Sequence, residues 1–183
     1  MIDNKEITTK ARESLSNQWN LAIGTFFVFL LISGLGNEVS LLIGGAMQLG
    51  ASIFALNIAR GKKAEFSQLF DGFKNFANSL VANLLMIVFI LLWMLLLIIP
   101  GIIAAIAYSQ TFFIMADDKK ISGSDAIKKS KQMMMGHKGK YFMLCLRFSG
   151  WFILSILTLG IGFLWLVPYV SVSMANFYDA VKK

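Results

Sequence analysis

Few side chains in this sequence have a type and a position suited to chemistry, and Arg147 is the foremost of them. It is the one ionised residue well inside an apolar segment, which covers residues 141–157. Burying an unpaired charge in a bilayer is costly, so an embedded Arg indicates a functional site by default. The alternative is structural: the long side chain reaches the lipid phosphates or bonds to the last helix, at Ser173, Asn176 or Asp179.

The sequence lacks the usual signatures of catalysis. It has no HExxH, GxSxG, P-loop or GxGxxG motif, and no Asp or Glu lies inside an apolar segment. The chain has one His, His137, and one Cys, Cys145, so neither a multi-Cys metal site nor an intramolecular disulfide can form. We therefore predict that the protein is not an enzyme and uses no cofactor or metal.

A second group of candidate residues is basic. Lys alternates with aromatic residues and Met over residues 125–142. Near an anionic inner leaflet each Lys contributes about 1 kcal/mol of attraction, and an amphipathic helix places its apolar face at the headgroup boundary. Nucleic acid is the other usual partner of a basic surface, and we predict membrane lipid instead. The predicted lipid or ligand residues are Arg147, Asn176, Lys128, Lys129, Lys131, Lys138 and Lys140.

The elements that position these residues are unusually apolar. Hydrophobic residues make up 57% of the 183 residues, and the mean hydropathy is +0.68, as in polytopic membrane proteins. Residues 79–116 carry no charged side chain, and as one helix they would measure nearly twice the bilayer core of about 30 Å. Pro100-Gly101 lies just past the middle of this stretch. We predict two spans that meet there at a tight corner.

Six apolar segments predict an all-α polytopic membrane protein with six transmembrane helices. The segments are 21–36, 41–58, 80–99, 101–116, 141–157 and 161–178. They pair into three hairpins, because the connections at 37–40, 100–101 and 158–160 are short and carry no Lys or Arg. All but one of the 17 Lys and Arg residues lie in the termini and the two long connections. The positive-inside rule then places both termini in the cytoplasm.

An amphipathic segment precedes each hairpin and is predicted to be a cytoplasmic helix. Ile7, Ala11 and Leu15 recur at a spacing of four, a stripe of Phe residues begins at Phe66, and Ala126 and its neighbours share an apolar face. The predicted N-cap residues of these helices are Thr8, Ser67 and Ser122. The chain thus reads as one membrane domain, 1–183, with a threefold internal repeat at about 1–60, 61–120 and 121–183.

Three blocks of the sequence occur in an order that resembles a known family. The blocks are IIPGIIAAIAYSQTFFIMADD from Ile98, AIKKSKQMMMGHKGKYF from Ala126, and FSGWFILSILTLGIGFLWLVPYVSVSMANFYD from Phe148. They resemble the bacterial integral-membrane family called domain of unknown function 975, which is related to the membrane domain of some glycerophosphodiester phosphodiesterases. The resemblance implies a multi-pass protein of the bacterial cytoplasmic membrane, close to phospholipid. It implies no catalytic residues.

The sequence leaves three functions open. The leading one is a non-enzymatic membrane protein that interacts with lipids or with a membrane-active partner. The second is a small transporter or channel subunit, with a path lined by Arg147 and by polar residues of the second, third and sixth apolar segments. The third is a partner subunit of a larger membrane complex, and a homo-oligomer is also open.

Overall fold

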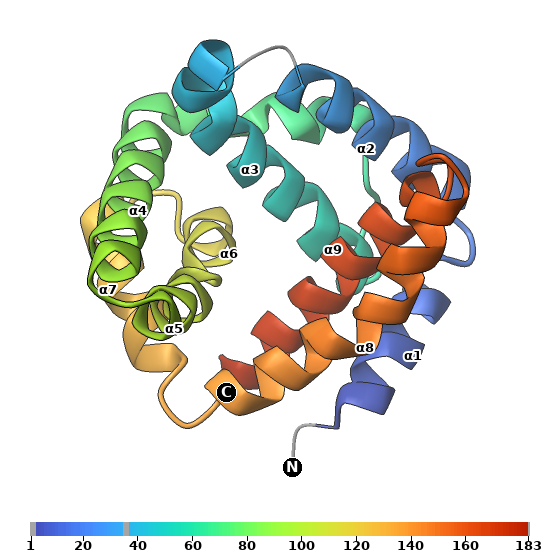
Figure 1. The fold of residues 1–183 in the computed structure, drawn as a ribbon. Helices are drawn as coiled ribbons and strands as arrows, with labels where there is room; N and C mark the ends of the chain where they lie inside the picture. The colour runs from blue at the N-terminus through green and yellow to red at the C-terminus, as the bar shows by residue number, and fades with distance from the viewer. Residues whose placement is uncertain (1–2, 35–36, 183) are drawn as a thin grey trace.

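The computed structural model describes residues 3–34 and 37–182, and for residues 37–40 the backbone alone (Figure 1). Every element in these ranges is a helix, so the predicted all-α class is confirmed. The elements are α1 (Asn4–Leu15), α2 (Trp19–Ser33), α3 (Asn37–Ala59), the 3₁₀ helix η1 (Phe66–Asn75), α4 (Phe76–Leu96), α5 (Ile98–Tyr108), α6 (Thr111–Asp117), α7 (Gly123–Met133), α8 (Lys138–Leu157) and α9 (Phe163–Val181).

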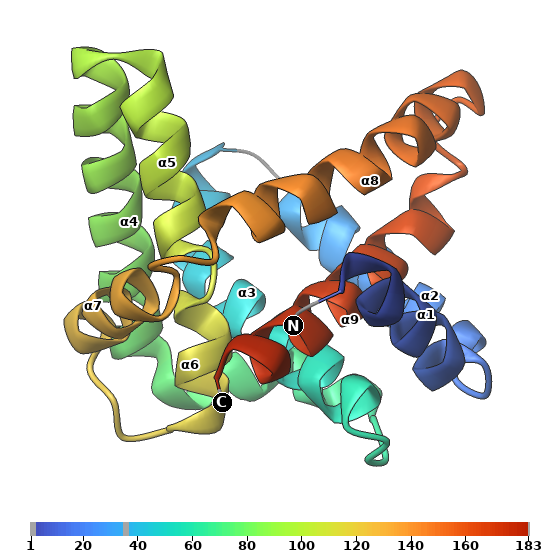
Figure 2. The same ribbon diagram turned by 90° about the horizontal axis from the view of Figure 1, so that it is seen from below.

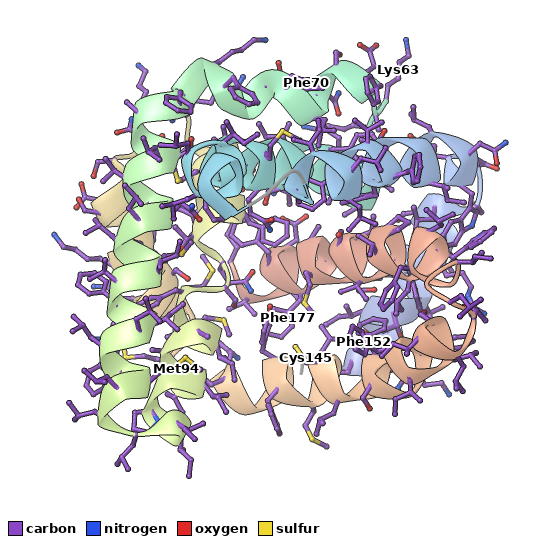
Figure 3. All side chains as sticks on the ribbon, turned by 45° about the horizontal axis from the view of Figure 1, so that its top comes forward. Lys63, Phe70, Met94, Cys145, Phe152 and Phe177 are labelled. Atoms are coloured by element: carbon purple, nitrogen blue, oxygen red, sulfur yellow. The ribbon has the colours of Figure 1, made fainter. Side chains whose placement is uncertain are left out.

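The helices form three hairpins, each preceded by an amphipathic helix. The first hairpin is α2–α3, the second is α4 with α5 and α6, and the third is α8–α9. In each hairpin the second helix lies toward the middle of the molecule and the first lies outside it (Figure 1). The core accordingly contains Met47, Phe54 and Ile58 of α3 and Phe177 of α9, and Figure 3 shows Phe177 between α8 and α9.

Each amphipathic helix packs on the hairpin that precedes it in the chain. Helix η1 packs along α3 of the first hairpin, and α7 packs on α4, α5 and α6 of the second. Helix α1 has no hairpin before it and packs on α9 of the third. The chain therefore closes on itself, and its described ends lie near each other (Figures 1 and 2).

Glycines permit this close packing. A Cβ atom added to Gly50 of α3 would lie 1.8 Å from the Leu69 carbonyl oxygen of η1. One added to Gly72 of η1 would lie 1.9 Å from the Ala46 carbonyl oxygen, and one added to Gly123 of α7 would lie 2.5 Å from the Asn78 carbonyl oxygen. Any larger residue at these positions would push the backbones apart.

The tight corner of the second hairpin lies at Leu97, so the prediction of Pro100-Gly101 is wrong. Leu97 is extended, with φ −162° and ψ 142°, between α4 and α5. Pro100 lies in the first turn of α5, where the missing N–H breaks no intrahelical bond. Gly101 faces Met94, and an added Cβ would lie 2.2 Å from Met94 Cγ. Gly101 thus lets α4 and α5 approach, and it does not form the corner.

The segment predicted at 101–116 is two helices, because a side chain of α7 interrupts it. The break lies at Ser109 and Gln110, between α5 and α6. Ser130 of α7 donates its hydroxyl to the Ala107 carbonyl at 2.8 Å and accepts from the Gln110 N–H at 3.2 Å. An inserted hydroxyl of this kind is a known cause of a helix break, and here it fixes α7 to the second hairpin.

The other two corners differ in outcome. The corner predicted at 37–40 is wrong, because α3 already begins at Asn37, and residues 35–36 lie outside the described chain. The corner predicted at 158–160 is confirmed between α8 and α9. Leu159 there has a φ of 53° and Gly160 one of 90°, the left-handed region that a tight turn requires. The Thr158 hydroxyl accepts the Gly162 N–H at 3.0 Å.

One of the three predicted N-caps is confirmed. Ser122 precedes α7, and its hydroxyl accepts the Asp125 N–H at 3.2 Å. Thr8 lies inside α1, which Asp3 caps instead, and Ser67 lies inside η1. In both wrong cases the helix begins earlier than the apolar periodicity suggested.

The described chain contains several helices compatible with a membrane. Four stretches are long and apolar enough to cross one: Leu41–Ala59, Phe66–Leu96, Ile98–Asp117 and Lys138–Leu157. Helices α1 and α2 would add a fifth only as a pair bent by 101°. Alone, the 15 residues of α2 rise about 22 Å, less than a bilayer core of about 30 Å. Six crossing helices therefore remain a prediction.

Replacement of Gly50 by Ala tests the α3–η1 contact. We expect Gly50→Ala to lower the free energy of unfolding by about 2 kcal/mol, because the new methyl group overpacks against the Leu69 backbone. Gly24→Ala is the control, because Gly24 lies in α2 with nothing within 4 Å of an added Cβ. Thermal unfolding in detergent measures both, and equal stability of the two variants would contradict the packing.

Candidate functional site

The ends of the three hairpins meet in a group of charged side chains that we call the Arg60 cluster: Arg60, Asp117, Tyr178, Asp179 and Lys182. Arg60 follows α3, Asp117 ends α6, and Asp179 lies in the last turn of α9. The Arg60 guanidinium donates to both Asp117 oxygens at 2.6 and 3.0 Å and to both Asp179 oxygens at 2.6 and 3.0 Å. One planar side chain thus holds two carboxylates, each in bidentate geometry.

The remaining members of the cluster act on Asp117. The Tyr178 hydroxyl donates to Asp117 Oδ2 at 3.0 Å, and Lys182 Nζ donates to the same oxygen at 2.6 Å. The side chains of Asp117 and Arg60 are 15% and 26% exposed, so water screens this network less than a surface ion pair. Hydrogen bonds from Arg60 to Asp179 and then to Asp117 raise the pKa of the guanidinium further above its ordinary value.

This arrangement favours a structural role for the Arg60 cluster. Every carboxylate oxygen of Asp117 and Asp179 already accepts a bond from Arg60, which leaves neither acid poised to move a proton. Within residues 3–34 and 37–182, no group of three or more His, Cys, Asp or Glu side chains is placed to hold a metal ion. The cluster joins the three hairpins at one end.

A polar cavity lies next to the cluster, between α1, α8 and α9. Its volume is about 570 Å³, and Asp179 of the cluster forms part of its wall. Charged and polar side chains dominate the lining: Asp3, Glu6, Lys10, His137, Lys140 and Asn176. We call this space the α1–α9 cavity.

Two residues that line this cavity have a buried polar atom without a hydrogen-bond partner, Asn176 at Nδ2 and His137 at Nδ1. Asn4 Oδ1, at the start of α1, is a third such atom, and Asn4 Nδ2 donates to the Lys140 carbonyl at 3.0 Å. Buried polar groups normally have partners, because a missing bond costs free energy. The site therefore suits a hydrated or polar ligand that can both accept and donate hydrogen bonds.

The structure separates the residues that the sequence grouped as lipid or ligand contacts. It brings Asn176 and Lys140 together at the α1–α9 cavity. Lys138, the first residue of α8, does not line this cavity. The other predicted lysines, Lys128, Lys129 and Lys131, are exposed on α7.

Arg147 lies apart from every site described here. It is exposed on α8, and none of the expected bonds to Ser173, Asn176 or Asp179 forms. Asp179 bonds to Arg60 instead. Of the two structural roles predicted for Arg147, the reach to lipid phosphates is the one that its position permits.

A second cavity collects polar residues of the apolar helices. Its volume is about 600 Å³, and Gln48 of α3, Asn83 of α4, Tyr108 of α5 and Tyr141 of α8 line it. Gln48 is exposed there although the neighbouring residues of α3 are buried. Gln48 and Asn83, polar residues of the second and third predicted spans, thus line one cavity, whereas Arg147 does not line it.

The Arg60 cluster was missed in the sequence, although a signal for it exists. Asn57-Ile-Ala-Arg60, Ile114-Met-Ala-Asp117 and Asn176-Phe-Tyr-Asp179 each place a charged residue at the end of the second helix of a hairpin. Alignment of these three four-residue stretches at their last residue places Arg60, Asp117 and Asp179 at one position, where their charges are opposite.

Comparison with known proteins identifies a family to which no activity is assigned. The model of the family described as "Protein of unknown function (DUF975)" matches residues 1–104 and 94–183, which together cover the whole chain. No curated protein and no solved structure matches the chain. The family description names no substrate, and the predicted link to glycerophosphodiester phosphodiesterases stays a prediction.

Removal of Arg60 tests whether the cluster holds the hairpins together. We expect Arg60→Ala to destabilise the fold by about 2 kcal/mol, because two partly buried carboxylates lose their shared partner. Arg60→Lys should lose part of the same stability, because an ammonium group cannot make bidentate contacts with both carboxylates. Thermal unfolding in detergent measures the loss of stability of each variant.

The control for this series is Lys63→Ala. Lys63 pairs with Glu65 at 3.2 Å, but its side chain is 87% exposed, so little change is expected. If the Arg60→Ala and Lys63→Ala variants unfolded at the same temperature, the Arg60 cluster would not hold the hairpins together.

Proposed function

We propose, for a chain that belongs to the DUF975 family, a role as a non-enzymatic integral protein of the bacterial cytoplasmic membrane that binds lipid. Its three hairpins enter the membrane from the cytoplasmic side, and both termini stay on that side. A membrane-active partner or a second copy of the chain fits the same surfaces. The proposal is supported by where the structure exposes apolar and charged side chains.

The observation that carries the proposal is the apolar surface of the second and third hairpins. Leu95 is 85% exposed, Ile99 71%, and Leu159 95%. Around them α4, α5 and α8 expose almost continuous Leu, Ile, Phe and Trp side chains, and Figure 3 shows Met94 and Phe152 on these hairpins. Soluble proteins rarely expose such large apolar patches, whereas a lipid environment satisfies them.

The amphipathic helices carry the features of a headgroup layer. On η1, Leu69 is buried against α3 while Phe66, Phe70 and Phe73 stay 38–42% exposed. Adjacent rings of this stripe pack at centroid distances of 5.7 and 6.5 Å. Aromatic residues are favoured where one side of the ring meets acyl chains and the other meets polar headgroups.

The basic surface of α7 supports the choice of anionic lipid. Lys128, Lys129 and Lys131 are all exposed, and Asp125 is the one acid paired with them, at 3.4 Å from Lys128. A net positive helix beside an anionic leaflet is attracted to it, and the attraction weakens as salt increases. We assign the α1–α9 cavity, with Lys140 and Asn176, to a polar headgroup.

A second candidate function is a small transporter or channel subunit. The specific observation in its favour is the cavity lined by Gln48, Asn83 and Tyr108. A path from this cavity would not pass Arg147, which faces outward on α8. Native mass spectrometry separates the candidates, because retained phospholipid favours lipid binding and a retained small solute favours transport.

Alkaline carbonate extraction tests the membrane placement. We expect the protein to stay in the membrane pellet, because the apolar hairpins and not electrostatic attraction hold it there. Washing with high salt should also release none of it. Recovery of folded protein in the carbonate supernatant would contradict an integral membrane protein.

Neutralisation of α7 tests the lipid preference. We expect the triple variant Lys128→Gln, Lys129→Gln and Lys131→Gln to bind anionic nanodiscs several-fold more weakly relative to zwitterionic ones, at low salt. The matched control changes the same three residues to Arg, which keeps the charge. An unchanged preference for anionic lipid in the Gln variant would show that α7 does not dock on the leaflet.

A further inference from the structure

The charged helix that packs on a hairpin limits how deep that hairpin can lie in the membrane. Helix α1 shows this most clearly. Asn4, at the start of α1, bonds to the Lys140 carbonyl at the base of the third hairpin, at 3.0 Å. Further along, Arg12 lies over the Tyr169 ring at 5.9 Å. Arg12 and Trp19 also line one cavity of about 240 Å³ together with Thr158 and Gly162, at the tip of that hairpin. Helix α1 thus packs along the third hairpin from its base to Tyr169 of α9, and of α1 and α2 only the side chains of Arg12 and Trp19 border the cavity that reaches the tip.

Helix α1 cannot lie in hydrocarbon. Its outer face exposes Lys5, Glu6, Lys10, Arg12 and Glu13. The Glu6–Lys10 ion pair, at 2.8 Å, has both side chains about 60% exposed. Charges at that exposure belong to water or headgroups. The part of the third hairpin that α1 covers, from its base to Tyr169, must therefore lie beside water or the headgroup layer.

The second hairpin has the same relation to α7. Gly123, at the start of α7, lies against Asn78 near the base of α4. Lys128 and Lys131 line a cavity of about 370 Å³ with Trp93 near the end of α4. The same cavity is also lined by Leu85, so α7 and its lysines lie beside residues 85–93 of α4. From Leu85 to the corner at Leu97, α4 rises about 18 Å, which is less than a bilayer core of about 30 Å. The second hairpin therefore extends beyond α7 by less than the thickness of that core (Figure 2).

The contact between the first and second hairpins does not fit a topology with six membrane crossings. In that topology Leu41, at the start of α3, would lie at the outer face of the membrane. Asn83, in the first turns of α4, would lie near the cytoplasmic face. In the structure Asn83 Nδ2 donates to the Leu41 carbonyl at 3.4 Å. A Cβ added to Gly45 would likewise lie 2.3 Å from the Ser79 carbonyl oxygen. The base of the second hairpin therefore lies beside the outer part of the first.

The hairpins also diverge. Figure 2 shows the α4–α5 pair upright and α8 inclined away from it, with the two tips far apart. Within the described residues, α2, α4 and α8 form no packing interface with one another. Parallel spans of a six-helix bundle would pack side by side.

Both described tips suit a lipid environment. At the second tip the Leu97 N–H donates to the Trp93 carbonyl at 3.1 Å, and Pro100 has no N–H to leave free. At the third, the Gly160 N–H donates to the Ser155 carbonyl at 3.0 Å. Leu95 and Leu159 beside these tips are the two most exposed large hydrophobic residues of the described chain. Backbone donors without partners would forbid such a position in hydrocarbon, and here they are largely satisfied.

We infer that the hairpins do not cross the bilayer. The protein is held in the cytoplasmic leaflet, with its three hairpins inclined to the membrane plane and their apolar tips ending in hydrocarbon. The partner of these surfaces is the lipid of one leaflet. The inference rests on the membrane placement of the proposed function and replaces its six predicted crossings.

Cysteine accessibility tests this topology. In the full-length protein with Cys145→Ser, Leu97→Cys and Leu159→Cys place single thiols at the second and third tips, and Lys129→Cys is the cytoplasmic control. We expect no labelling of either tip by a membrane-impermeant maleimide added to intact spheroplasts. Lys129→Cys should react in inverted vesicles, and all three thiols should react in detergent.

Labelling of either tip thiol from outside would overturn the inference. The variants must unfold at the temperature of the Cys145→Ser protein, so that a tip exposed by misfolding is not mistaken for crossing. If a tip thiol fails to react even in detergent, Leu95→Cys replaces it, since Leu95 is 85% exposed. A carbonate-extractable protein refutes the proposed function, whereas outside labelling of a protein that resists carbonate refutes only the one-leaflet topology.

Discussion

The close contact between each apolar hairpin and a charged amphipathic helix is the constraint on which the rest of this structure depends. Gly50, Gly72 and Gly123 remove the side chains that would keep the backbones apart, so η1 and α7 lie directly on α3 and α4. A rigid contact of this kind ties the position of the hairpin to the position of the helix. Because exposed Lys and Glu residues must stay in water or headgroups, they limit how deep the hairpins can go.

The Arg60 cluster completes this arrangement at the other end of the hairpins. The hairpins diverge toward their tips and need a connection where they meet. Arg60 supplies it, since one guanidinium accommodates two bidentate carboxylates from α6 and α9. The lysine and tyrosine that also bond Asp117 leave this group fully partnered. Two buried polar atoms without a partner, Asn176 Nδ2 and His137 Nδ1, belong to residues that line the neighbouring α1–α9 cavity, which makes the cavity the better place for a ligand.

These features together favour a protein that acts through lipid. In the proposed placement, the apolar tips, the Phe stripe of η1 and the lysines of α7 would contact the acyl chains, the interface and the charged headgroups of one leaflet, respectively. Three inclined hairpins would occupy area in that leaflet alone. Arg147, which looked like the best single site in the sequence, is exposed on α8 at a position that suits contact with lipid phosphates.

The sequence by itself determined the all-helical class, the corner at 158–160 and the segregation of Lys and Arg from the apolar segments. Apolar runs and the periodicity of Ile7, Ala11 and Leu15 are local properties, and they indicate where helices form and which face of each is apolar. The tertiary structure decided what depends on residues distant in the chain. Ser130 breaks the segment after Pro100 from 20 residues away, Arg60 meets Asp117 and Asp179 across 57 and 119 residues, and α1 returns to the last hairpin. Hydropathy counts only how apolar a helix is, whereas the packing of its neighbours decides where it lies.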